Sequence, residues 1–86
     1  MKAVYIVNDL NVARILVDPM RRAILDLLRQ RPMTQTQLGY VLGLTGASLN
    51  YHMKKLRSKE LMVVAKREVE DSILQIFFSS TAPICI

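Results

Sequence analysis

The sequence has little of what most catalytic and metal sites require. It contains one cysteine, one histidine, three glycines and no tryptophan. Cys85 cannot close an internal disulfide, which suits a reducing compartment. His52 has no cysteine, aspartate or glutamate at ligand spacing, and one imidazole alone does not make a metal or catalytic site. We therefore predict that the protein binds no metal or cofactor and is not an enzyme.

Phosphate-binding loops and long apolar runs are absent as well. Gly39, Gly43 and Gly46 lie in and between predicted helices and do not form a glycine-rich loop. The apolar start MKAVYIV is interrupted by Asn8 and Asp9 before it reaches the length of a signal sequence. No run approaches the ~20 residues that cross a bilayer. We expect a cytoplasmic protein without a membrane partner.

The apolar residues that are present suffice for one small domain. The chain has 86 residues, of which 51% are hydrophobic and 22% charged, and it contains no internal repeat or linker. We therefore predict a single domain over residues 1–86. A core of this size gives only marginal stability, so a second copy of the chain is the expected source of more.

The positive charge is concentrated in the middle of the chain. The net charge is +5, which favours an anionic partner. Residues 19–60 contain eight lysines and arginines against only Asp26 and Glu60, whereas residues 1–18 are neutral and residues 61–86 are slightly acidic. The predicted binding region is therefore the middle of the chain.

Four helices are predicted, at about 9–16, 19–30, 35–42 and 46–58. Asp18 and Pro19 supply an N-cap carboxylate and a fixed first φ for the second helix. Thr34 and Gln37 have capping-box spacing, and Gly43 suits the left-handed end of the third helix. Its apolar stripe is expected to comprise Leu38, Val41 and Leu42. The fourth helix is expected to begin after an N-cap at Thr45.

Two β-prone runs follow, at about 61–69 and 73–80. The polar residues Glu70, Asp71 and Ser72 separate them at hairpin spacing. The apolar run 3–7 can add a short edge strand. The predicted fold class is mainly α with a small β-hairpin (α+β), that is, a winged helix-turn-helix.

The fourth helix has the pattern of a DNA reader. Leu49, Met53 and Leu56 form one apolar stripe, so the polar and basic residues face outward. Asn50 can bridge an adenine and Lys54 a guanine. The side chains expected in the major groove are those of Ala47, Ser48, Asn50, Tyr51, Lys54 and Lys55.

Three segments together resemble a known family. They are DPMRRAIL from Asp18, TQTQL from Thr34 and SLNYHMKKL from Ser48. With the strand pair, residues 9 to about 82 resemble the winged helix-turn-helix of ArsR-type transcription regulators. The resemblance implies a homodimer that binds operator DNA, with helix 46–58 in the major groove and the wing along the backbone or minor groove. Metal-sensing members use a cysteine pair or ligands near the dimer helices, and because no cysteine lies at 34–58, metal sensing is not expected.

We accordingly predict a transcription regulator, acting as a repressor, that binds specific double-stranded DNA as a homodimer. Phosphate contacts are expected from hydroxyls, helix-terminal amides and basic side chains. These residues are Thr34, Gln35, Thr36, Thr45, Arg57, Lys66 and Arg67. The acidic tip Glu68–Asp71 weakens the expected wing contact. The family's C-terminal dimerisation helix has no counterpart in this sequence, so residues 9–16, the N-terminal strand or the apolar wing are expected to join the subunits.

Two alternatives remain. A winged-helix module that docks proteins would use the wing, whose two faces both carry apolar residues such as Ile73 and Leu74. A binder of RNA or single strands would need exposed aromatic platforms, and only Tyr51 qualifies on the basic face. The aligned polar face of helix 46–58 favours duplex DNA over both.

Overall fold

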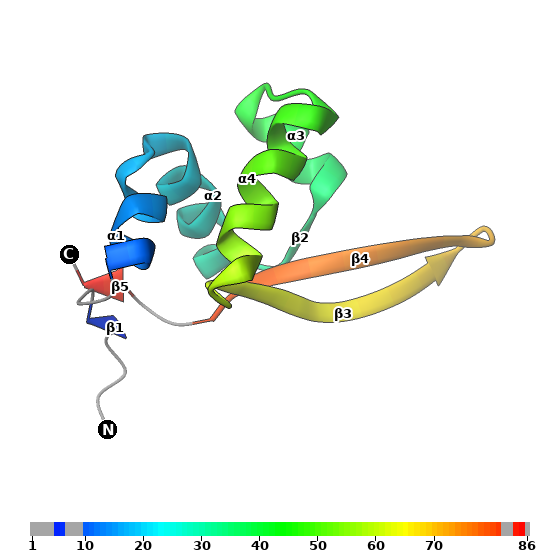
Figure 1. The fold of residues 1–86 in the computed structure, drawn as a ribbon. Coiled ribbons are helices and arrows are strands. Elements are labelled where there is room, and N and C mark those ends of the chain that lie inside the picture. Colours follow the sequence, from blue (N-terminus) through cyan, green and yellow to red (C-terminus); the bar gives the residue numbers. More distant parts are fainter. Residues whose placement is uncertain (1–4, 7–9, 82–83, 86) are drawn as a thin grey trace.

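The computed structural model describes residues 5–6, 10–81 and 84–85. Its helices are α1 (Leu10–Val17), α2 (Pro19–Gln30), α3 (Gln35–Leu42) and α4 (Gly46–Ser58). Its strands are β1 (Tyr5–Ile6), β2 (Met33–Thr34), β3 (Met62–Glu70), β4 (Ile73–Ser80) and β5 (Ile84–Cys85). The helices gather in one cluster, and the hairpin of β3 and β4 projects from it (Figure 1). This is a winged helix-turn-helix, which confirms the predicted fold class.

Local capping interactions set the helix boundaries. Asp18 Oδ1 accepts a hydrogen bond from the backbone N–H two residues later at 2.8 Å, and Pro19 begins α2. At α3 the Thr34 hydroxyl accepts from the Gln37 N–H at 3.1 Å, and the Gln37 side chain accepts from the Thr34 N–H at 3.0 Å. Gly43 ends α3 with a left-handed φ of 68°. These three capping predictions are confirmed.

Some boundaries and short strands differ from the predictions. The first helix runs one residue later than the predicted 9–16, and residue 9 itself lies outside the described residues. The first wing strand is also shifted by one residue, to Met62–Glu70. Within the run 3–7 only Tyr5–Ile6 is described as strand, and it pairs in parallel with β5. Neither this pairing nor β2 was expected, because two-residue strands leave no periodicity in a sequence.

The sheet contains three antiparallel strands in the order β2, β4, β3. β2 pairs only with Phe77 and Phe78 at the inner end of β4, so the outer part of the hairpin has two strands. Its turn is formed by Asp71 and Ser72, which have φ values of 53° and 65°. Positive φ at both central residues is the geometry that matches the twist of a tight hairpin. The polar turn predicted from the sequence is therefore confirmed.

The core lies between the helices and the base of the hairpin. The largest side chains that are almost fully buried are Ile24, Leu28, Met33, Leu38, Leu49, Leu56 and Met62. Phe78 of β4 joins them, which fixes the hairpin to the helices. Leu27 of α2 is partly buried and packs against this core. In the part of the chain that the structure describes, no helix is both long and apolar enough to span a membrane.

The apolar stripe of α3 differs from the prediction. Leu38 is buried and Leu42 packs against the core, but Val41 is 53% exposed. The reason is the close approach of α3 to α4 at Gly39, where a Cβ would lie 3.6 Å from a methyl carbon of Leu49. The buried stripe therefore passes through Leu38, Gly39 and Leu42, and Val41 is turned toward solvent.

The C-terminal end of α4 carries a backbone feature with no sequence signal. Glu60 adopts a left-handed φ of 56°. Its N–H donates to the Arg57 carbonyl at 3.0 Å, and the Leu61 N–H donates to the Leu56 carbonyl at 2.9 Å. These bonds satisfy carbonyls at the end of α4. They also direct the chain into β3, so that the hairpin starts beside the last turn of α4.

Candidate nucleic-acid interface

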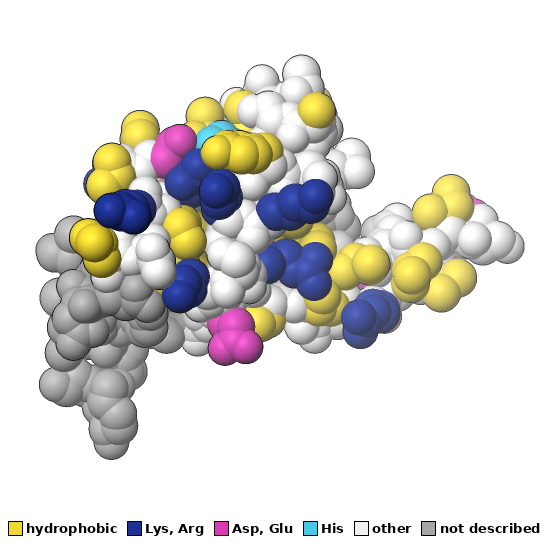
Figure 2. Space-filling model, in the orientation of Figure 1, with side chains coloured by type: hydrophobic (Ala, Val, Ile, Leu, Met, Phe, Trp, Pro, Cys, Tyr) yellow, Lys and Arg dark blue, Asp and Glu magenta, His cyan; other side chains and the backbone are white. Residues whose placement is uncertain are grey.

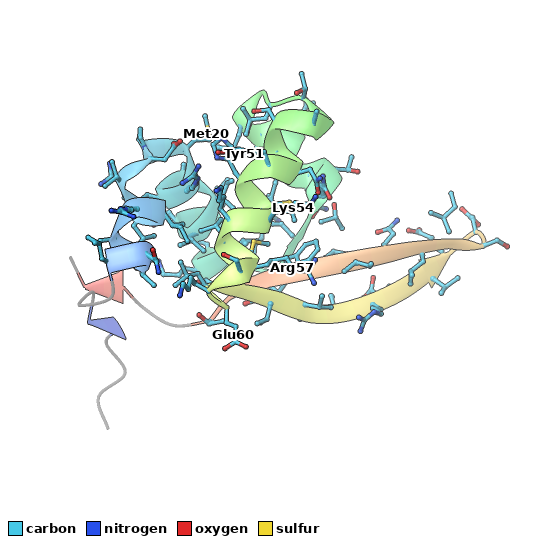
Figure 3. The ribbon with its side chains drawn as sticks, in the orientation of Figure 1. Met20, Tyr51, Lys54, Arg57 and Glu60 are labelled. Atoms are coloured by element: carbon cyan, nitrogen blue, oxygen red, sulfur yellow. The ribbon has the colours of Figure 1, made fainter. Side chains whose placement is uncertain are left out.

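α4 has one buried stripe and a broad exposed face. Leu49, Met53 and Leu56 are at most 3% exposed and belong to the core. Lys54 and Arg57 lie on the side of α4 nearer the hairpin (Figure 3). The predicted groove-reading residues are all exposed on this helix: Ala47, Ser48, Asn50, Tyr51, Lys54 and Lys55. The structure thus brings them together on one element.

Basic side chains collect on the face that carries α4. Figure 2 shows lysine and arginine side chains spread over α4, the neighbouring part of α1 and the inner part of the hairpin, with few acidic side chains between them. A surface of this kind attracts a polyanion and raises its rate of association. Part of the charge excess that the sequence shows for residues 19–60 is therefore presented on the face that carries α4.

The predicted phosphate-contacting threonines are engaged as helix caps. The Thr34 hydroxyl accepts from the N–H of Gln37, and the Thr45 hydroxyl accepts from the N–H of Ser48 at 3.2 Å. A hydroxyl has one donor hydrogen as well as two acceptor lone pairs, so both can cap a helix and still donate outward. Thr36 and Thr45 are exposed, whereas Thr34 and Gln35 are half-buried. All four lie at the first turn of a helix.

One flank of α4 faces the hairpin. Steps of ~100° per residue set Asn50, Lys54 and Arg57 on the same side of the helix. The Arg57 guanidinium lies over the ring of Phe78, 5.5 Å from its centroid. Because Phe78 is buried at the base of the hairpin, Arg57 is held where helix and wing meet. This flank therefore combines polar, basic and wing residues.

The other flank of α4 faces α2 and holds an aromatic and basic cluster. The Tyr51 ring lies 5.6 Å from the Arg21 guanidinium and 5.5 Å from the Lys55 ammonium. Arg21 Nε donates to His52 Nδ1 at 3.1 Å, and Arg21 Nη1 donates to the Ile15 carbonyl at 3.3 Å. His52 thus has the hydrogen-bonding role of a helix-flank residue, and Tyr51 is held beside two cations.

The sequence predictions did not assign a binding role to Arg21. It was only one of several outward-facing residues of the second helix, and its partner His52 is 31 positions away. Together with Arg14 and Lys59, Arg21 lines a groove that α1 and α4 share. The family-like segment DPMRRAIL contains Arg21, but no spacing rule connects it with Tyr51. Only the packing of α2 against α4 brings them together.

The wing cations are divided between the two faces of the hairpin. The strand register shifts at Ala65, and beyond this bulge Lys66 pairs with Phe77 while Arg67 pairs with Ile76. Lys66 Nζ lies 4.7 Å from the Phe77 ring centroid and 3.1 Å from a Glu68 carboxylate oxygen. Lys66 and Arg67 therefore point to opposite faces of the hairpin.

The tip of the wing is both acidic and apolar. Val69, Ile73 and Leu74 are 72%, 64% and 54% exposed. The acidic residues Glu68, Glu70 and Asp71 lie in the same segment and are all exposed. Val69 and Leu74 are cross-strand partners on one face of the hairpin, whereas Ile73 lies on the other face, so each face of the tip exposes apolar area. A surface with this charge repels phosphate, so the tip differs in character from α4.

Comparisons with known proteins agree with this geometry. A family model described as “Helix-turn-helix domain” matches residues 16–65, more than half of the chain. The fold is similar to that of NolR from Sinorhizobium fredii, with a TM-score of 0.69, 26% sequence identity, and coverage of 84% of this chain and 67% of that chain. Reduced HlyU from Vibrio cholerae gives a TM-score of 0.71 at 20% identity, with coverage of 85% and 72%.

The fold is also similar to that of a third solved structure. It is the homodimeric winged helix-turn-helix DNA-binding domain of Mb0332 from Mycobacterium bovis, a possible ArsR-family transcriptional regulator. The TM-score is 0.65 at 20% identity, and the match covers 81% of this chain and 60% of that chain. At this identity the likeness concerns the fold. Among curated proteins, none matches the chain.

Proposed function

We propose that this chain, which belongs to the helix-turn-helix domain family, is a DNA-binding transcription regulator of the ArsR type and reads specific double-stranded DNA through α4. One observation carries the proposal. α4 buries only Leu49, Met53 and Leu56 and exposes polar and basic residues along its whole length. A helix is about 10–12 Å in diameter and the major groove about 12 Å wide, so α4 fits the groove with its exposed face toward the bases.

Base recognition in this proposal is divided among the exposed residues of α4. Asn50 pairs with an adenine edge, and Lys54 donates to a guanine. Ala47 contacts a thymine methyl. Ser48, Tyr51 and Lys55 complete the set that enters the groove. Support comes from the common exposure of these residues on one helix face.

Affinity in this proposal comes from phosphate contacts around that helix. Thr34, Gln35, Thr36 and Thr45 are near the first turns of α3 and α4, where amides and hydroxyls favour anions. The cationic contacts are expected on the wing side of α4, from Arg57, Lys66 and Arg67. Arg57 is the best positioned of the three, because the Phe78 ring holds it at the junction of α4 and the hairpin.

Selection of bound sequences from a random duplex pool tests the proposal directly. Specific reading by α4 requires a recurring short site among the recovered duplexes. A gel-shift titration at two salt concentrations accompanies it, because phosphate neutralisation makes affinity fall steeply with salt. If no duplex is bound even at low salt, the proposed function is wrong. If binding occurs but no sequence is enriched, the protein binds DNA without sequence specificity, and that part of the proposal is wrong.

We further propose that the regulator acts as a homodimer and represses by covering its site. Leu10 and Val17 of α1 are 65% and 70% exposed, and their burial between two subunits would remove apolar area from water. A twofold dimer on DNA would bind half-sites about 34–36 Å apart. Sedimentation over a range of concentrations tests the dimer, and a Leu10→Ser and Val17→Ser variant should shift it toward monomer.

Repression is tested separately, in a reporter assay with the selected site placed across a promoter. The expected result is lower expression when the regulator is present. Higher expression would identify an activator and contradict repression while leaving the DNA-binding proposal unaffected.

A second candidate function is protein docking through the wing. The exposed residues Val69, Ile73 and Leu74 favour it, because exposed apolar side chains gathered on both faces of one hairpin tip commonly mark an interaction surface. This function predicts that replacing the three residues with serine abolishes partner binding but leaves DNA affinity unchanged. Under the DNA proposal alone, the same variant keeps every measured activity.

A further inference from the structure

We propose that the groove between α1 and α4 binds a phosphate of the DNA backbone, on the side of α4 opposite the hairpin. The inference rests on the proposed function, because it takes α4 to lie in the major groove. It adds Arg14, Arg21 and Lys59 to the residues that contact DNA. Arg14 and Arg21 come from α1 and α2, outside the helix-turn-helix and the wing, and Lys59 directly follows α4.

The groove has the composition of an anion site. Its volume is about 450 Å³, and Arg14, Arg21, Lys55 and Lys59 line it together with the hydroxyl-bearing residues Tyr51 and Ser58. No carboxylate is among the described residues that line it. The four cations converge from α1, α2 and α4, so their fields add in one place. An anion in the groove therefore meets several donors, and no carboxylate of the described lining competes with it.

Arg21 is held in place before any ligand arrives. It is half-buried, donates to His52 Nδ1 and to the Ile15 carbonyl, and lies over the Tyr51 ring. These two hydrogen bonds use two of the five N–H donors of a guanidinium. A planar guanidinium fixed in this way suits phosphate, because little side-chain freedom is lost when the contact forms.

The dimensions of DNA make this groove part of the interface. A helix that nearly fills the major groove has a sugar–phosphate backbone on each side. On one side of α4 lie Lys54, Arg57 and the inner part of the wing (Figure 3). On the other side lie Tyr51 and Lys55, which border the groove. The two flanks of α4 therefore face two different backbones, and both flanks are basic.

The first test measures duplex binding against salt for matched arginine variants. Arg14→Ala removes an exposed cation of the groove, and Arg21→Lys keeps the charge but loses the guanidinium geometry. Arg22→Ala is the control, because Arg22 is the neighbouring arginine of α2 but lines a different cavity, between α2 and the end of β4. Arg14→Ala should lower the slope of log K against log salt by about 0.9, the value for one phosphate. Arg22→Ala should leave the slope unchanged.

Thermal unfolding of each variant separates loss of contact from loss of fold. The binding result of Arg21→Lys is interpreted only if this variant unfolds at the same temperature as the parent chain. If it unfolds at a lower temperature, Arg14→Ala still decides the test, because Arg14 is exposed. If the parent chain binds no duplex at low salt, the proposed function fails. If it binds, and Lys54→Ala weakens binding while Arg14→Ala behaves like Arg22→Ala, only the present inference fails.

A second test locates the phosphate. Neutral methylphosphonate linkages are introduced one at a time into the duplex recovered by selection. One linkage on the flank away from the wing should weaken binding of the parent chain but have no further effect on Arg14→Ala. If both proteins are sensitive to the same set of linkages, the assignment is overturned. If inorganic phosphate saturates the groove in an NMR titration while Arg14→Ala keeps full DNA affinity, the groove is a small-anion site and the assignment is likewise wrong.

Discussion

Helix α4 and the hairpin of β3 and β4 are adjacent in the chain but differ in how they are supported and charged. α4 buries three large side chains and carries mostly basic or neutral polar residues on its exposed face. Beyond Val64, every residue of β3 is exposed, and the tip is acidic. Only the inner end of the hairpin is fixed, by Met62 and Phe78 in the core.

This difference separates two tasks within one small fold. A DNA reader must keep its side chains in register with base edges, which requires a helix fixed from behind by a packed core. A projecting hairpin with few buried contacts opens locally at low cost, so it suits adaptable contacts better than precise ones. We therefore assign specificity to α4 and expect the wing to contribute less to both stability and base reading.

The largest expected effect tests the support behind α4. Leu56→Ala removes a fully buried side chain under the helix and should lower the free energy of unfolding by about 2–5 kcal/mol. Val69→Ala removes a similar apolar group from the wing tip, where it is 72% exposed, and should change it by less than about 0.5 kcal/mol. Chemical denaturation of both variants provides the measurement. Equal losses would mean that the wing tip is packed in solution.

The next effect concerns base discrimination. Lys54→Ala should remove about 1–3 kcal/mol of discrimination at one base pair, because in the proposed function its ammonium donates to a base edge. Arg57→Ala should weaken binding to all sequences alike, since its contact is with phosphate. Fluorescence anisotropy on the selected duplex and its single-base variants distinguishes the two. The division of roles within α4 would be wrong if both variants changed discrimination equally.

A smaller effect is expected at the first turn of α4. Thr45→Ala removes the hydroxyl that accepts from the Ser48 N–H and should cost about 1 kcal/mol of stability. Thr36→Ala, at an exposed position inside α3, is the matched control and should be close to neutral. Urea denaturation measures both. A neutral Thr45→Ala would show that packing alone fixes the start of α4.

The smallest expected effects on stability are at two residues with a left-handed backbone conformation, one at the end of α4 and one in the wing turn. Glu60→Gly at the end of α4 should raise the free energy of unfolding by about 0.5–1 kcal/mol, because glycine adopts a positive φ without steric cost. Ser72→Gly in the wing turn should mainly raise hydrogen-exchange protection in β3 and β4. Glu60→Gln, which removes the charge but keeps the Cβ, should not reproduce the gain. Global stabilisation by both glycine variants would indicate that hairpin and helices unfold as one unit.

Most of the fold could be predicted because its signals are local. The Asp18 cap, the Thr34 and Gln37 capping box and the left-handed Gly43 each involve residues within four positions of one another. The stripe of Leu49, Met53 and Leu56 likewise follows from one helical repeat. The polar face of α4, and with it the predicted groove-reading set, could be identified for the same reason.

The parts that could not be predicted depend on contacts between distant segments. The bulge at Ala65 decides which wing face carries Arg67 and which carries Lys66, and a strict two-residue alternation gives no indication of it. Val41 fits the helical repeat of α3, yet it is exposed because α4 packs at Gly39 instead. Both outcomes follow from which element is packed against which.

By itself the sequence determined where the helices begin and end, that a hairpin follows them, and that α4 exposes a basic polar face. Short-range hydrogen bonding and side-chain periodicity suffice for these. Only the tertiary structure decided that α4 has two unlike flanks: Arg57 over Phe78 beside the wing, and Arg21 with Tyr51 beside α1. The reason is physical, since Arg21 and Tyr51 become neighbours only when α2 and α4 bury their apolar stripes in a common core.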